Sequence, residues 1–330
     1  MFNRRDVAAD TSSAFTIAVN GTDERQVGAA NVSCTGWSPD LRAVCTDWLP
    51  NGARPAVVDS EGAHLSVLDA YPDRERSVIC EEWFPDGARL LCRTEPDGSQ
   101  ADDGLYVVDA SDGSDVSRIT STPDRCFDGD EVLSPNETEL LFVRFCESDG
   151  RGTLFRVGID GTDLVGLSGS DATIVDAWDR FPADWSPDGS HVVFSARSAL
   201  STADPAYVLF VANRNGTGIR QVVPDDVGAV TARWSPDASW IAFTSKLRSE
   251  PQVWLVHPDG TGLVELTQSV AGSTSLAPIW SPDGSRLLFA TAHSAAVELW
   301  TIGVDGSVPS RLTDLGSVES IGYAWGASTQ

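Results

Sequence analysis

The sequence Trp280-Ser281-Pro282-Asp283-Gly284-Ser285-Arg286-Leu287-Leu288-Phe289 places a polar turn between two apolar segments. Proline presets φ for a turn, aspartate can bond its own backbone, and glycine accepts positive φ, so this stretch predicts a hairpin turn. The chain repeats the pattern from Trp185 and Trp234, and more weakly from Trp37, Trp83 and Leu133. A second turn follows each of these six anchors, ending at Gly62, Gly113, Gly161, Gly216, Gly260 and Gly306.

The spacing of the anchors indicates the architecture. Successive anchors from Trp37 to Trp280 are 46, 50, 52, 49 and 46 residues apart. Repeats of this length, each with four short strands, are typical of a β-propeller. Since no single unit can bury both of its faces, the blades must close into a ring. The sequence therefore predicts an all-β propeller of four-stranded blades.

Both ends of the chain fit a shared closing blade. Residues 15–27 read as a third and fourth strand around Asn20-Gly21, and residues 320–326 read as a first strand that ends at Trp325-Gly326. We expect residues 1–30 and 317–330 to form one blade, with N-terminal outer strands and a C-terminal inner strand. The stretch from Phe2 to Ala9 is a poor candidate for its second strand. This closure predicts seven blades in one domain over residues 1–330; a frame anchored at Trp48 leaves six as the alternative.

The composition limits the partners. The chain has 48 acidic and 23 basic residues and a net charge of −25, which argues against binding a nucleic-acid backbone. It has no run of 18 apolar residues, so we expect no membrane insertion. We identify no signal segment at the N-terminus of this chain. The closed repeat favours a monomer.

The cysteines recur at matched positions. Cys80 and Cys92 lie at offsets −3 and +9 from their anchor, and residues that face each other across an antiparallel hairpin have a constant sum of offsets. The sum is 6 for this pair and also for Cys126 and Cys146, at offsets −7 and +13. It is 5 for Cys34 and Cys45, at offsets −3 and +8, where the turn is one residue shorter. We predict three disulfides, and hence an extracytoplasmic compartment, periplasmic or secreted: Cys34 with Cys45, Cys80 with Cys92, and Cys126 with Cys146. Four blades have phenylalanine at +9, so the alternative is that these cysteines are small core residues.

The anchors resemble the repeat of TolB-like propellers, also called the PD40 or WD40-like repeat. Its pattern is Trp-Ser-Pro-Asp-Gly, an apolar strand that ends in Phe, and a strand that runs into Asp-Gly-Thr; residues 180–313 match it best. The resemblance implies the propeller fold along the whole chain and a periplasmic scaffold that binds proteins or peptides. Related propellers precede a peptidase domain, but this chain has no Gly-x-Ser-x-Gly motif.

No residue set points to a reaction. The four histidines fall at different positions of different blades, so we expect them to form no common metal site: His64, His191, His257 and His293. The acidic run from Asp124 to Glu131 lacks the spacing of an EF-hand loop. We therefore predict no cofactor, no metal and no catalytic residue, and the sequence favours a non-enzymatic role.

Recognition on a repeated scaffold is usually carried by its variable loops. In a propeller the residues just before the anchors line the axial channel, and those at its mouth are mostly acidic here: Glu81, Glu82, Asp130, Glu131, Asp184, Arg233 and Tyr323. Basic residues recur where the second strands end, and they form an outer rim: Arg93, Arg144, Arg197, Arg248 and His293. The alternative is that these basic residues pair with nearby acids. The longest connection contributes Trp178, Asp179 and Arg180, as a partner anchor or as packing between blades.

We therefore expect an extracytoplasmic propeller that binds a protein or peptide at the face formed by the blade-connecting loops. Two other classes of function stay open. One is a carbohydrate-active or lyase-type enzyme that uses channel carboxylates, which would require two of them at a suitable separation. The other is binding of a small ligand or cation in the channel.

Overall fold

The stretch that begins at Trp280 forms a tight turn between β25 (Ser273–Trp280) and β26 (Arg286–His293). The backbone N–H of Gly284 donates to the Ser281 carbonyl (2.8 Å), and Gly284 has a φ of 69°. Asp283 Oδ1 accepts hydrogen bonds from the Ser281 hydroxyl (2.6 Å) and the Ser285 backbone N–H (3.0 Å). The turn chemistry predicted from the sequence is confirmed.

The computed structural model describes residues 1–6, 11–18, 20–50, 52–59, 61, 65–68, 77–94, 103–147, 151–167, 172–173, 183–198, 207–245, 250–267, 273–293, 296–313 and 324–325. Strands and turns make up the secondary structure of this part of the chain. Within it, no helix has the length and apolarity needed to cross a membrane. The chain forms two compact units, which we describe separately: Met1–Asp128 with Ala295–Val297 and Leu315–Gln330, and Gly129–Ser294 with Glu298–Asp314.

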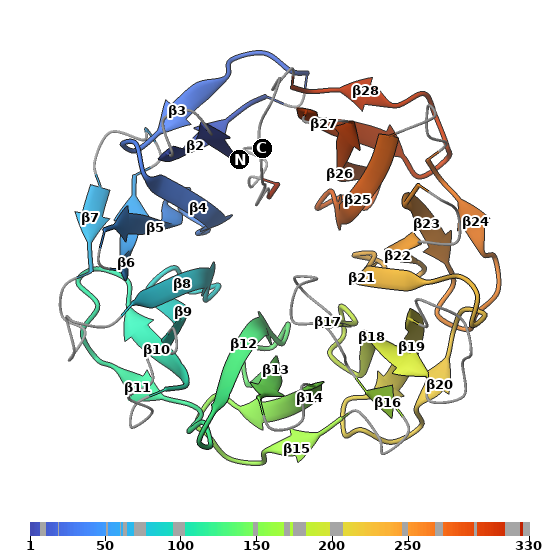
Figure 1. Ribbon diagram of the computed structural model, residues 1–330, viewed down its shortest axis with the longest axis horizontal. Coiled ribbons are helices and arrows are strands. Elements are labelled where there is room, and N and C mark those ends of the chain that lie inside the picture. Colours follow the sequence, from blue (N-terminus) through green and yellow to red (C-terminus); the bar gives the residue numbers. More distant parts are fainter. Residues whose placement is uncertain are drawn as a thin grey trace. The chain divides into compact units, whose positions relative to one another are not determined.

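In the first unit, sequence neighbours pair as antiparallel strands (Figure 1). One sheet has four strands in chain order: β8 (Val78–Trp83), β9 (Arg89–Thr94), β10 (Leu105–Asp109) and β11 (Ser117–Arg118). A second sheet has the order β4 (Val32–Trp37), β5 (Ala43–Leu49), β6 (Gly52–Val58) and β7 (Leu65–Val67). Beside β4, the same sheet continues into β2 (Thr11–Thr16), which pairs with β1 (Phe2–Asp6) and β3 (Arg25–Val27).

The second unit repeats this plan. Its first sheet contains β12 (Cys126–Leu133), β13 (Glu139–Cys146), β14 (Arg151–Gly158) and β15 (Val165–Gly166). In the next sheet β16 (Ala172–Thr173) and β17 (Ala183–Trp185) both pair with β18 (His191–Ser198), followed by β19 (Tyr207–Asn213) and β20 (Arg220–Gln221). Two further sheets contain β21 (Ala229–Trp234), β22 (Ile241–Ser245), β23 (Gln252–Val256) and β24 (Val264–Glu265), and β25, β26, β27 (Ala296–Gly303) and β28 (Ser310–Arg311).

Phenylalanines on the second strands form the repeated part of the core. Phe194 is fully buried and stacks on Phe210 with ring centroids 5.6 Å apart. Phe142 on β13 stacks on Phe155 at the same distance. Burial of each such ring stabilises the fold by about 1.5–3 kcal/mol, which is why an apolar strand follows every turn.

The stretch from Phe2 to Asp6 is a strand, so the expectation that it is a poor candidate was wrong. Phe2 is fully buried and stacks on Phe15 at 5.6 Å, as the phenylalanines of the other second strands do. The polar residue Asn3 is accommodated because its side-chain amide bonds the backbone of Cys34: Nδ2 donates to the carbonyl (2.9 Å) and Oδ1 accepts from the N–H (2.8 Å).

The two chain ends meet beside this strand. The Met1 amino group donates to the Ala324 carbonyl (2.9 Å), and the Ala324 N–H donates to the Met1 carbonyl (3.0 Å). Ala324 directly precedes Trp325, and Met1 directly precedes Phe2. The other sheets show the same register between the anchor and the buried residue of the second strand. For example, Asp184, just before the anchor Trp185, pairs with Val193, just before the buried Phe194. Seven blades, with residues 1–30 and 317–330 as the closing blade, stay a prediction.

The cysteines are oxidised, as the offsets predict. Cys34 faces Cys45 across β4 and β5, Cys80 faces Cys92 across β8 and β9, and each pair is a disulfide. The third predicted pair, Cys126 and Cys146, is also disulfide-bonded, so none of the cysteines among the described residues is free. Disulfides form and persist in oxidising compartments, so the protein fits an extracytoplasmic environment.

The turn aspartates give the fold a dependence on acid pH. Hydrogen bonds from the Ser281 hydroxyl and from Ser285 lower the pKa of Asp283 from 3.8 to about 2. The hydroxyl of Ser186 and the contacts of Ser190 likewise lower the pKa of Asp188 to about 2. A carboxylate with a lowered pKa in the folded state stabilises the fold above its unfolded pKa, and this stabilisation is lost as pH falls.

The free energy of unfolding should decrease as pH falls from 3.8 to about 2, and we expect this decrease to be smaller in the double variant Asp188→Asn and Asp283→Asn. Asparagine can keep the turn, because Asn136 Oδ1 accepts from the Ser134 hydroxyl (2.8 Å) at the corresponding position. Urea unfolding at several pH values measures the slope of stability against pH, with Asp226→Asn in another loop as the control. An unchanged slope in the double variant would show that these turns do not contribute to the acid sensitivity.

Candidate functional site

The charged residues predicted at the channel mouth lie on first strands. Glu81 and Glu82 are on β8, and Asp184 and Arg233 are on β17 and β21. Asp130 and Glu131 are on β12, where Glu131 is buried and Asp130 has a φ of 52°. Five other residues of the predicted site and rim lie outside the described residues: Trp178, Asp179, Arg180, Arg248 and Tyr323.

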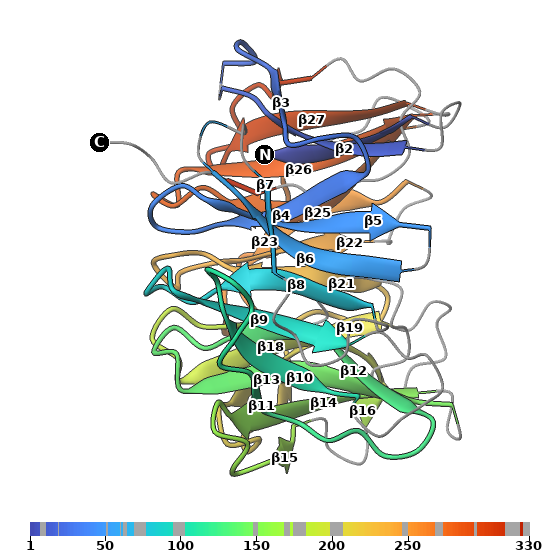
Figure 2. The same cartoon turned by 90° about the vertical axis from the view of Figure 1, so that its left-hand side faces the viewer.

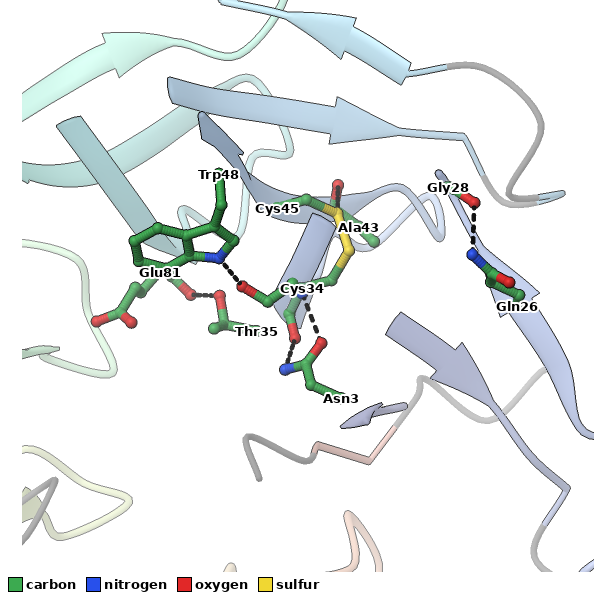
Figure 3. Close-up of a disulfide and its surroundings, with 10 residues drawn as sticks. Asn3, Gln26, Gly28, Cys34, Thr35, Ala43, Cys45, Trp48 and Glu81 are labelled. Carbon is green, nitrogen blue, oxygen red and sulfur yellow. Dashed lines mark hydrogen bonds between the residues drawn. A yellow bond between two sulfur atoms is a disulfide. The ribbon is translucent and has the colours of Figure 1, made fainter. Parts of the chain in front are cut away.

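In the first unit, Glu81 links two neighbouring first strands. A bulge interrupts the pairing of β8 with β9 between Cys80 and Glu82. The Glu81 carbonyl accepts a hydrogen bond from the Thr35 hydroxyl on β4 (3.1 Å; Figure 3). Its carboxylate forms an ion pair with Arg93. Arg93 of the predicted rim is thus paired with Glu81 of the predicted mouth. For this pair, the structure agrees with the alternative that the basic residues pair with nearby acids.

Asp184 is a carboxylate of the second unit with a raised pKa. Burial raises its pKa, although the nearby Arg233 guanidinium and hydrogen bonds from the backbone N–H groups of Trp234 and Trp185 oppose the rise. Its Oδ2 accepts the Trp234 N–H at 2.9 Å. The backbone hydrogen bond fixes the carboxylate between two first strands, which gives Asp184 a structural role. Its raised pKa also makes it a candidate functional residue.

Two of the anchor tryptophans, Trp185 and Trp280, tie neighbouring first strands together. Trp185 Nε1 donates to the Val132 carbonyl (3.2 Å), and Trp280 Nε1 donates to the Arg233 carbonyl (3.1 Å). Each acceptor is the residue just before the preceding anchor. These two tryptophans therefore have a structural role, and their bonds use the backbone carbonyl of the residue before the preceding anchor and not its side chain.

Two further rim arginines stack on aromatic rings. The Arg144 guanidinium lies 5.5 Å from the ring centroids of both Phe142 and Phe155. Arg197 lies 6.0 Å from the Tyr207 ring, and the two residues face each other across β18 and β19. Sequence analysis did not predict these contacts. The available signal was the alternation of strand residues, which places Arg144 on the same face as Phe142.

Trp48 is not a repeat anchor. It lies near the end of β5 with 42% of its surface exposed, whereas the anchor Trp185 is 4% exposed. The frame that started at Trp48 is therefore wrong. Trp48 and Leu49 form an exposed apolar pair, which the sequence analysis did not predict.

The described histidines make local contacts. The His257 ring stacks on Trp240 with centroids 3.7 Å apart, and His191 Nδ1 is 2.7 Å from the Ser190 hydroxyl. Within the described part of the chain, no group of three or more His, Cys, Asp or Glu residues could hold a metal ion.

No family model matches the chain. Its structure is similar to a putative TolB from Agrobacterium tumefaciens, with 18% identity and a TM-score of 0.54 over 78% of this chain and 86% of that one. It is similar to the β-propeller domain of the Trilobed protease from Pyrococcus furiosus, with 11% identity and a TM-score of 0.64 over 96% and 91%. An oligogalacturonate lyase in complex with manganese shows 15% identity and a TM-score of 0.63 over 91% and 84%.

These similarities show that the chain is a β-propeller. They confirm the resemblance to TolB-like propellers at the level of the fold. Because the same fold occurs in a lyase and beside a protease, the function of this chain depends on its own side chains.

Proposed function

We propose that the protein is a non-enzymatic propeller that binds a protein or peptide in an extracytoplasmic compartment, periplasmic or secreted. The partner binds at the face formed by the blade-connecting loops and the residues that precede the anchors. The monomer is the binding unit, and it requires no cofactor.

The observation that carries this proposal is the contrast between repeated and varied positions on the first strands. The turn and the buried rings recur because every sheet needs them. The residue directly before the anchor changes from Glu82 to Asp184 to Arg233. Variation in charge at one repeated position is typical of a recognition surface on a repeat protein.

The disulfides support the compartment, and the resemblance to TolB-like propellers supports the class of partner. The net charge of −25 supports a partner with a basic surface, since charge complementarity raises the rate of association.

We expect Glu82→Gln combined with Arg180→Ala to reduce capture of a polypeptide partner from an extracytoplasmic extract. Loss of a rim charge mainly slows association, whereas loss of a buried charge pair costs about 2–5 kcal/mol of affinity. Asp163→Asn is the matched control, because Asp163 is exposed and lies in the turn between β14 and β15 of a single sheet and not in a blade-connecting loop. Equal capture by the wild type, the double variant and the control would place the binding surface elsewhere.

The alternative is an enzyme that acts on carbohydrate, and Asp184 is the residue that favours it. A half-buried carboxylate with a raised pKa is a candidate proton donor or acceptor. Cleavage of acidic oligosaccharides by the wild type, abolished in Asp184→Asn, would replace the binding proposal by this one. Asparagine can still accept the hydrogen bond from the Trp234 backbone.

A further inference from the structure

The strands β5 and β6 of the first unit form a hairpin and lie side by side in Figure 2. An exposed tryptophan, Trp48, lies near the end of β5 in this hairpin. Trp48 is 42% exposed and its neighbour Leu49 is 39% exposed. The strands continue to this end, because Trp48 pairs with Ala53 and Leu49 with Gly52. Neither side chain belongs to the repeated core, so the fold does not require an apolar pair at this position.

The indole is held in place although it is exposed. Trp48 Nε1 donates to the Ser33 hydroxyl (2.6 Å), and the Trp48 backbone N–H donates to the Asn31 carbonyl (2.9 Å). Figure 3 shows the indole joined in this way to β4, and the same strand contacts Glu81 through Thr35. A side chain fixed before binding loses little conformational entropy when a partner contacts it.

Other aromatic faces of this chain are covered by its own arginines. Arg42 lies 4.8 Å from the Trp83 ring, and Arg89 lies 4.2 Å from the Phe84 ring. Within the described part of the chain, no arginine or lysine lies over Trp48. Tryptophan is the aromatic residue that binds a cation most strongly, and the net charge of −25 attracts cations.

We propose that the exposed indole face of Trp48 is the docking point for an arginine side chain of the polypeptide partner. The guanidinium stacks on the ring, as the chain's own arginines do on its other aromatic residues, and Leu49 contacts the aliphatic part of the same segment. This inference rests on the proposed function only in that both require a polypeptide partner.

The test is a titration of the protein, labelled with ¹⁵N in its tryptophan indoles, with two short peptide amides of the same sequence. One carries arginine, and the other carries citrulline, which has a similar shape but no charge. Trp48→Phe assigns the Trp48 indole signal. We expect the arginine peptide to shift this signal saturably and to bind about 2- to 5-fold more tightly than the citrulline peptide.

Trp48→Ala should abolish the preference for arginine. Leu164→Ala should keep it, because Leu164 is 48% exposed but lies in the second unit. Equal binding of both peptides, or a Trp48 shift with a neutral oligosaccharide in place of the peptides, would overturn the inference. If a partner is captured equally by the wild type and Trp48→Ala, this inference fails while the proposed function stands. If the arginine peptide binds at Trp48 but Glu82→Gln with Arg180→Ala captures as much polypeptide as the wild type, the proposed binding face fails while this inference stands.

Discussion

Phe2→Ala is expected to lower the free energy of unfolding by about 3–5 kcal/mol, the cost typical of truncating a fully buried phenylalanine. Phe2 has no exposed surface, and its ring packs against Phe15. Its strand also holds the Cys34 backbone of β4 through Asn3, so loss of the ring should also loosen the β4 side of the same sheet. Urea unfolding followed by circular dichroism measures the change.

The matched comparison is Phe142→Ala, which removes the equivalent ring of β13. Both variants should be destabilised by similar amounts if the N-terminal strand is a true part of a blade. A change below about 1 kcal/mol for Phe2→Ala, with a large change for Phe142→Ala, would show that β1 is not required for the fold.

Joint replacement of Cys80 and Cys92 by alanine is expected to lower the free energy of unfolding by about 3 kcal/mol. The bond closes a loop with a sequence separation of 12 residues, and such loops restrict the unfolded chain by about this amount. Both sulfur atoms are buried, so their loss also removes packing. Chemical unfolding with and without a reductant measures the effect.

Alanine replacement of Cys34 and Cys45 is the matched variant, since that bond has a sequence separation of 11 and also joins a first and a second strand. The reductant should destabilise the wild type more than either variant. Equal stability of the wild type under reducing and oxidising conditions, or six free thiols in protein from its native compartment, would contradict the predicted role of the disulfides.

Much of the fold could be predicted from sequence, because the propeller repeats its local chemistry. The Ser-Pro-Asp-Gly turn needs a positive φ and an acceptor for its N–H groups, and both requirements are visible in the residues around Asp283. The cysteines could be paired because cross-strand register depends only on offsets. The strand Phe2–Asp6 was missed because no turn precedes it in the chain. Its signal was Phe2 itself, which occupies the phenylalanine slot of the second strands.

The candidate site was less predictable. The positions of Glu81, Asp184 and Arg233 on first strands follow from the repeat. Their partners do not, because an ion pair such as that of Glu81 with Arg93 depends on side-chain conformations that no repeat specifies. The exposure of Trp48 was also hidden, since its sequence resembles that of a buried anchor.

Cross-linking from position 82 tests the proposed function most directly. A photoreactive amino acid at this position, on the varied first-strand surface, is compared with the same group at position 308, in the exposed turn between β27 and β28 of a single sheet. After irradiation in an extracytoplasmic extract, we predict a protease-sensitive polypeptide adduct from position 82 and none from position 308. The absence of an adduct from position 82, or equal yields from both positions, would contradict polypeptide binding at this face.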